Sequence, residues 1–67
     1  MLIRVNGQHM QIEEDQLSVK DLLESLDLGV KTVVIECNEQ ILTKDMHPNT
    51  LLKDGDHIEI VHFVGGG

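Results

Sequence analysis

The stretch "LSVKDLLESLDLG", residues 17–29, carries most of the sequence signals of a short amphipathic helix. Ser18 is a candidate N-cap, and Asp21 follows three residues later at the spacing of a capping box. The apolar residues then recur at i, i+3, i+4 and i+7, which places them on one face: Val19, Leu22, Leu23 and Leu26. Gly29 is a candidate C-terminal cap. We therefore predict one helix of about 11 residues with a single apolar face.

The residues before this helix predict a β-hairpin. Apolar and polar side chains alternate along residues 1–5 and again along residues 9–13, as they do in strands with one buried face. Asn6-Gly7 stands between the two segments, and both residues tolerate the positive φ that a two-residue hairpin turn requires. Residues 14–17 then form a polar connection to the helix.

Three further strands are predicted after the helix. Residues 31–37 and 40–43 alternate in the same way on either side of Asn38-Glu39, which we interpret as a second tight turn. The last strand covers residues 57–63 and follows the turn sequence Asp54-Gly55-Asp56.

The segment between the fourth and the last predicted strands, residues 43–53, contains Pro48, so we predict that it is irregular. Leu51 and Leu52 are expected to fill part of the core.

A single helix can cover only one face of a small sheet. The order of elements therefore predicts an α+β domain of two layers whose second sheet face stays open.

The last strand decides what that open face presents. If Ile58 and Ile60 point towards the helix, alternation turns Val61 and Phe63 outwards, together with Glu59. Exposed apolar residues are candidate interfaces. The alternative, that this end of the strand only completes the core, remains open on the sequence alone.

Length and charge limit the function. A chain of 67 residues forms one small domain and buries only about 60% of the surface that it exposes when unfolded. Its formal net charge of −7 argues against nucleic acid and favours partners with a basic surface. The single cysteine, Cys37, can form no internal disulfide and is expected to act as a small buried hydrophobe. With no signal peptide or membrane span in evidence, we expect a soluble cytoplasmic protein.

The chain finishes with three glycines, residues 65–67. Glycine has no Cβ, so this tether is thin enough for a narrow channel, and it reaches at most about 10 Å when fully extended. We predict a domain over residues 1–63 and a flexible tail over residues 64–67 that presents the carboxylate of Gly67. A frayed terminus is the plainer alternative.

Several of these pieces, taken in order, resemble a known family. They are "IRVNG" (3–7), "LSVKDLLESLDL" (17–28), Asn38 and Ile41 within "CNEQIL", "LLKDGDHIEIV" (51–61) and the closing "VGGG" (64–67). Together they resemble the sulfur carrier proteins of thiamin biosynthesis, the ThiS family. The resemblance implies a ubiquitin-like β-grasp fold, with one helix across a small mixed sheet of four to five strands. Relatives often carry Pro-Arg where this chain has Thr43-Lys44.

The resemblance also implies a mechanism in which the protein is a co-substrate and not an enzyme. An E1-like, ThiF-like adenylyltransferase would use ATP and Mg²⁺ to adenylate Gly67, and a persulfide donor would then convert it to a thiocarboxylate. A ThiG-like thiazole synthase would accept the sulfur. The carrier itself would hold no permanent cofactor. The tail residues would be Gly65 and Gly66, and the residues expected to bind partners are Val61, Phe63 and Val64.

Other functions remain open at this point. A molybdopterin-synthase-type, MoaD-like carrier and a ubiquitin-like protein modifier would use the same tail. A metal site is not expected, because the four histidines and Cys37 lack the close spacing of metal ligands. The acidic run at residues 13–15 is interpreted as a solvated loop.

Overall fold

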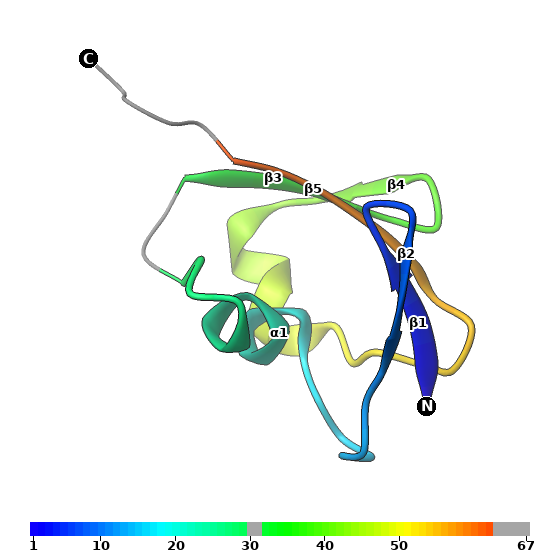
Figure 1. Ribbon diagram of the computed structural model, residues 1–67. Coiled ribbons are helices and arrows are strands. Elements are labelled where there is room, and N and C mark those ends of the chain that lie inside the picture. Colours follow the sequence, from blue (N-terminus) through cyan, green and yellow to red (C-terminus); the bar gives the residue numbers. More distant parts are fainter. Residues whose placement is uncertain (30–31, 63–67) are drawn as a thin grey trace.

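The computed structural model describes residues 1–29 and 32–62, and within them it forms two layers (Figure 1). One layer is a five-stranded sheet in the order β2-β1-β5-β3-β4, and α1 lies across one of its faces. This arrangement confirms the predicted α+β class. The elements are β1 (Leu2–Val5), β2 (Gln8–Gln11), α1 (Val19–Ser25), β3 (Val33–Cys37), β4 (Gln40–Leu42), the 3₁₀ helix η1 (Lys44–Asn49) and β5 (His57–His62).

The last strand occupies the centre of the sheet. β5 runs parallel to β1, with Val5 opposite Ile58, and antiparallel to β3, with Ile35 opposite Ile60. The two hairpins predicted from sequence, β1–β2 and β3–β4, therefore flank a strand that comes after both of them in the chain. The sheet is complete only when β5 has entered between them.

Both predicted turns are confirmed by their backbone angles. Asn6 and Gly7 have φ values of 51° and 84°, and Asn38 and Glu39 have φ values of 51° and 71°. Two consecutive residues with positive φ give the turn a twist that matches the twist of the flanking strands.

The core lies between the sheet and α1. Nine buried apolar residues form it: Ile3, Ile12, Val19, Leu22, Leu23, Ile35, Leu52, Ile58 and Ile60. Ile58 and Ile60 thus face the helix, as alternation along the last strand predicted. Leu26 is only partly buried at the edge of this cluster.

Leu51 was predicted to join the core, and this is wrong: its side chain is 53% exposed. Leu51 pairs with Ser18 in an isolated antiparallel bridge, and the Leu52 amide donates to the Leu17 carbonyl at 2.8 Å. Neighbouring residues in extended backbone point to opposite sides. Only one of the two leucines can face inwards, and it is Leu52.

The start of α1 has the predicted capping box. The Ser18 hydroxyl accepts from the Asp21 amide at 3.1 Å, and the Asp21 carboxylate accepts from the Ser18 amide at 3.0 Å. The hydrogen bonds that the Ser18 amide and the Ser18 hydroxyl donate to the Asp21 carboxylate lower the pKa of that carboxyl. The box therefore satisfies two amides that an uncapped helix would leave without partners.

The predicted end of the helix is wrong. The C-cap is Leu26, and Asp27, not Gly29, takes the left-handed conformation, with φ of 61°. The Leu28 amide donates to the Leu23 carbonyl at 2.8 Å, and the Asp27 amide donates to the Glu24 carbonyl at 3.1 Å, which is a Schellman motif. Aspartate tolerates this conformation better than most side chains, so the chain leaves the helix before reaching the glycine.

The segment predicted to be irregular contains regular structure. η1 runs from Lys44 to Asn49 with Pro48 inside it, and it packs beside α1. Thr43 is its N-cap residue, and the Met46 amide donates to the Thr43 carbonyl at 2.9 Å. η1 also buries His47, a residue that the sequence did not single out as a core side chain.

No helix within the described ranges combines the length and apolar character needed to cross a membrane.

The capping box makes a testable prediction. Ser18→Ala is expected to lower the free energy of unfolding by about 1 kcal/mol, because the Asp21 amide loses its acceptor. Urea denaturation measures the change, and Ser25→Ala, a serine inside the same helix, is the control and is expected to cost less. Equal stability of Ser18→Ala and the wild type would contradict this account of the cap.

A second prediction concerns acid. Because the pKa of Asp21 lies below its ordinary value of 3.8, its ionised form contributes stability that is complete above that value. The contribution is lost as the pH falls through the lower pKa of the folded state. The stability advantage of the wild type over Asp21→Asn should therefore be largest near neutral pH and disappear in acid, as followed by denaturation at a series of pH values.

Candidate functional site

The candidate site begins where β5 ends, at His62. Four of its predicted features, Phe63, Val64, the Gly65-Gly66 tether and Gly67, lie outside the described residues. Val61 is the one predicted site residue inside them. It is 58% exposed and stands on the sheet face opposite α1, so its predicted outward direction is confirmed. Its role in partner binding stays a prediction.

Asn6 holds the carboxyl half of β5. β1 pairs with β5 only at Arg4 and Val5. Beyond them, the Asn6 side chain makes the hydrogen bonds to β5 that a further residue of β1 would make. Its Oδ1 accepts from the Ile60 amide at 2.7 Å, and its Nδ2 donates to the Ile60 carbonyl at 3.2 Å. The side-chain amide thus acts as one more residue of the neighbouring strand. Sequence reasoning assigned Asn6 to the turn and missed this second task.

Asn38 does the same at the beginning of β5. Its Oδ1 accepts from the His57 amide at 2.9 Å, and its own backbone amide donates to the His57 carbonyl at 2.8 Å. Its Nδ2 donates to the Asp56 carboxylate at 3.0 Å. One asparagine from each hairpin turn therefore fixes one half of the central strand.

The Asp54-Gly55-Asp56 turn ties the start of β5 to β1. The Asp54 carboxylate accepts from the Leu2 amide at 2.8 Å, and the Gly55 amide donates to the Leu2 carbonyl at 2.8 Å. Gly55 has a φ of 88°, which a side chain would disfavour. Asp56 is only 8% exposed, and its carboxylate also accepts from the Lys53 amide at 2.8 Å. The residues that precede the strand are therefore joined by hydrogen bonds to β1 and to Lys53.

The sheet face opposite α1 carries exposed apolar side chains close to the end of β5. Val34 on β3 lies directly opposite Val61, and Ile41 on β4 lies opposite Glu36, two residues further along β3. All three apolar side chains are exposed. We call Val34, Ile41 and Val61 the open-face patch. Its position beside the last strand makes it a candidate docking surface.

Charged residues adjoin the open-face patch. Glu36 and Glu59 are direct cross-strand partners, a pairing of like charges that is unfavourable without a compensating group. The Glu59 carboxylate lies 3.2 Å from the His57 Nε2, and that nitrogen lies 3.5 Å from an Arg4 guanidinium nitrogen. The surface therefore offers a partner both apolar contact and negative charge, which suits a basic rim.

Cys37 is not arranged as a nucleophile. It is half-buried on the core side of β3, and burial, followed by the nearby Asp56 charge, raises the pKa of its thiol. A raised pKa keeps the group as the less reactive thiol. The acidic run at residues 13–15 is exposed, as predicted. In the part of the chain that the structure describes, no three metal-ligating side chains come together.

Comparisons with known proteins agree on one family. A family model described as "ThiS family" matches residues 3–67. Sulfur carrier protein ThiS from Bacillus subtilis is 41% identical over 66 residues, covering 98% of this chain and 100% of that protein. A crystal structure of the thiamine biosynthesis protein ThiS from Geobacter metallireducens superposes with a TM-score of 0.84 at 33% identity, covering 100% of both chains.

A thiazole synthase from Paramagnetospirillum magneticum is also similar. It is 33% identical over 67 residues, and these make up 100% of this chain but 20% of that enzyme. The chain thus spans about a fifth of the length of this relative.

A third prediction concerns the hydrogen bonds between the Asn6 side chain and Ile60. Asn6→Gly keeps the positive φ but removes both hydrogen bonds to Ile60, so it should lower the free energy of unfolding by about 1–3 kcal/mol. The Ile60 amide should exchange its hydrogen faster. Glu39→Gly, at a positive-φ position of the other turn, is the control and should be neutral or stabilising. Unchanged exchange at Ile60 in Asn6→Gly would refute the role given to the side chain.

Proposed function

The chain belongs to the ThiS family, and on that premise we propose that the carboxylate of Gly67 is the group through which it carries sulfur. It is a sulfur carrier protein with the ubiquitin-like β-grasp fold of the Geobacter metallireducens ThiS structure. The resemblance found in the sequence is thereby confirmed. The observation that carries the proposal is that the family match extends through residue 67 and so includes the whole glycine tail.

The chemistry requires activation of that carboxylate. A carboxylate resists nucleophilic attack, so a Gly67 oxygen first attacks the α-phosphorus of ATP, and pyrophosphate leaves. The terminal sulfur of a persulfide then forms a bond to the carbonyl carbon as AMP departs. Cleavage of the remaining S–S bond by a thiol leaves the thiocarboxylate. In this scheme an E1-like adenylyltransferase uses ATP and Mg²⁺ to activate Gly67, and the carrier binds no permanent cofactor.

The chain supplies position and access, and no described side chain has to act as an acid, base or nucleophile. β5 is held on both sides by backbone pairing and by Asn6 and Asn38, so the base of the tail is fixed. The open-face patch, with Phe63 and Val64 beyond it, would bind the activating enzyme and the acceptor. Glycine at residues 65–67 would let the terminus enter a narrow active site. This division of tasks supports a co-substrate rather than an enzyme.

Thiazole synthase is the proposed acceptor. Thiazole synthases from Paramagnetospirillum magneticum and Magnetococcus marinus each contain a segment similar to this whole chain. A carrier joined to its acceptor in one polypeptide would have a high effective concentration at the acceptor site. This association favours the thiamin branch over a MoaD-like carrier or a protein modifier. The cytoplasm, where thiols stay reduced, is the compartment that suits this chemistry.

The intact mass of the protein tests the carrier role. After incubation with an E1-like adenylyltransferase, ATP, Mg²⁺ and a persulfide donor, the chain should gain the mass of one sulfur-for-oxygen exchange. Fragmentation should place the exchange at Gly67. A chain that ends in a carboxamide at Gly67 is the control and should not change. Exchange at any other residue would overturn the proposal.

Gly66→Ala tests the narrow-channel argument. An added methyl group in the tether should misplace the carboxylate in the activating enzyme and slow adenylation by about tenfold or more. The thermal unfolding midpoint should not change, since the packed core is built from residues between Ile3 and Ile60. Gln8→Ala, an exposed change on β2, is the control and should keep the wild-type rate. Adenylation of Gly66→Ala at that rate would exclude a tightly fitting channel.

A further inference from the structure

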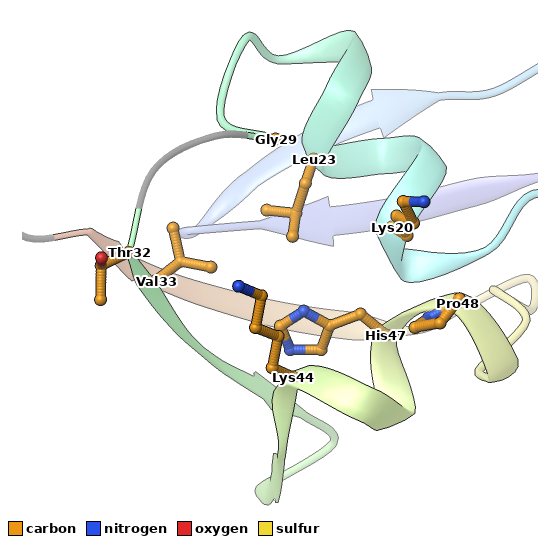
Figure 2. Close-up of a pocket in the computed structure, with 8 residues that line it drawn as sticks. All are labelled: Lys20, Leu23, Gly29, Thr32, Val33, Lys44, His47 and Pro48. Carbon is orange, nitrogen blue, oxygen red and sulfur yellow. The ribbon is translucent and has the colours of Figure 1, made fainter.

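A pocket opens on the α1 side of the sheet, away from the open-face patch (Figure 2). It has a volume of about 480 Å³ and lies between α1, η1 and the start of β3. Its lining residues are Lys20, Leu23, Gly29, Thr32, Val33, Lys44, His47 and Pro48. We call it the His47 pocket. The sulfur-carrier chemistry proposed above makes no use of it.

His47 is the first reason to regard this pocket as a binding site. Its side chain projects from η1 into the space below α1, and only 5% of the residue is exposed. Its Nε2 is buried and has no hydrogen-bond partner among the described residues. Buried polar atoms are nearly always paired, with protein, water or ligand, because an unpaired one loses its hydration without replacement.

Two lysines are the second reason. Lys20 on α1 and Lys44 on η1 both line the His47 pocket, in a chain with only five Lys and Arg residues and a net charge of −7. Within residues 1–29 and 32–62, neither lysine is within ion-pair distance of a carboxylate. Both ammonium groups would attract an anion that enters the pocket.

The carboxylates that follow the two lysines in the sequence accept hydrogen bonds from other residues. Asp21 follows Lys20, but it accepts hydrogen bonds from Ser18 in the capping box. Asp45 follows Lys44, but it accepts from the Thr43 hydroxyl at 2.7 Å. Glu24 is the acidic side chain nearest to Gly29. A Cβ added at Gly29 would lie 3.0 Å from the Cγ of Glu24. Neither Asp21 nor Asp45 forms a close ion pair with the neighbouring lysine among the described residues.

The rest of the lining and the size indicate the class of ligand. Leu23, Val33 and Pro48 add apolar surface to the lining, interspersed with its basic residues (Figure 2). A bare oxyanion would fill only part of 480 Å³, a volume within the range of sites for small organic ligands. We propose that the His47 pocket binds a small organic phosphate, with its phosphate between Lys20 and Lys44, hydrogen-bonded by His47, and its apolar part against Leu23 and Val33.

The location gives this binding a consequence. Val33, at the pocket wall, pairs with His62, the last described residue of β5. The ligand would therefore lie on the helix side of the strand pair from which the tail continues. The open-face patch, on the other side of the sheet, would stay accessible to a protein partner.

The test uses the full 67-residue chain and adenosine 5′-monophosphate as the probe. NMR titration at constant ionic strength follows the ring resonances of His47, assigned by their loss in His47→Gln, and the amides of Gly29 and Thr32. These signals should shift saturably. Adenosine, which lacks the phosphate, and inorganic phosphate, which lacks the apolar part, should each bind at least about threefold more weakly.

Variants of exposed lysines keep the test independent of folding. Lys20→Gln and Lys44→Gln should each weaken binding roughly three- to fivefold. Lys53→Gln makes the same charge change outside the pocket and should alter binding by less than about twofold. The proposal is overturned if the probe leaves the His47 ring unmoved, if adenosine or inorganic phosphate binds equally well, or if Lys53→Gln weakens binding as much as the pocket variants.

Discussion

The placement of β5 between two hairpins that precede it in the chain is the constraint on which the rest of the structure depends. Backbone pairing with β1 covers only the first half of this strand, at Arg4 and Val5. The amide of Asn6 continues the ladder to Ile60, and the amide of Asn38 secures His57. Each asparagine also adopts the left-handed conformation of its turn. A single residue type thus shapes each hairpin and joins it to the central strand.

A small carrier needs a fixed strand before its tail and a terminal carboxylate that can reach a partner's active site. The hydrogen bonds of Asn6 and Asn38 to β5 provide the first of these. The strand that precedes the tail is held by backbone pairing with β3 and by the side chains of Asn6 and Asn38, whereas the proposed reacting group is a main-chain carboxylate, that of Gly67. No side chain needs a tuned pKa for this purpose. Burial raises the pKa of the Cys37 thiol, which makes the chain's one cysteine less reactive.

The two faces of the sheet differ in what they offer a binding partner. One face has no helix over it and combines the open-face patch with the Glu36–Glu59 pair, so it suits a protein surface that is apolar and basic. The other face is covered by α1 and η1, and the incomplete contact between them leaves the His47 pocket. A domain this small has room for only one helix layer, and it is the edge of that layer that provides the hollow.

Local patterns in the sequence were enough to predict the start of α1, both hairpin turns, the alternation that turns Ile58 and Ile60 inwards and Val61 outwards, and the family. The structural features depend on residues close together in the chain, and the family was identified from short motifs in a fixed order along it. The tertiary structure decided the order of the strands, the choice of Leu52 over Leu51 for the core, the end of the helix at Asp27 and the existence of η1. It also gave Asn6 and Asn38 their second roles in the sheet, and it buried His47. The end of α1 and the start of η1 depend on local hydrogen bonds, from Asp27 and Leu28 and from Met46. The strand order, the choice of Leu52 and the roles of the two asparagines depend on pairing between distant segments, such as Asn6 with Ile60 and Ser18 with Leu51, and no local pattern records which distant backbone group a side chain will meet.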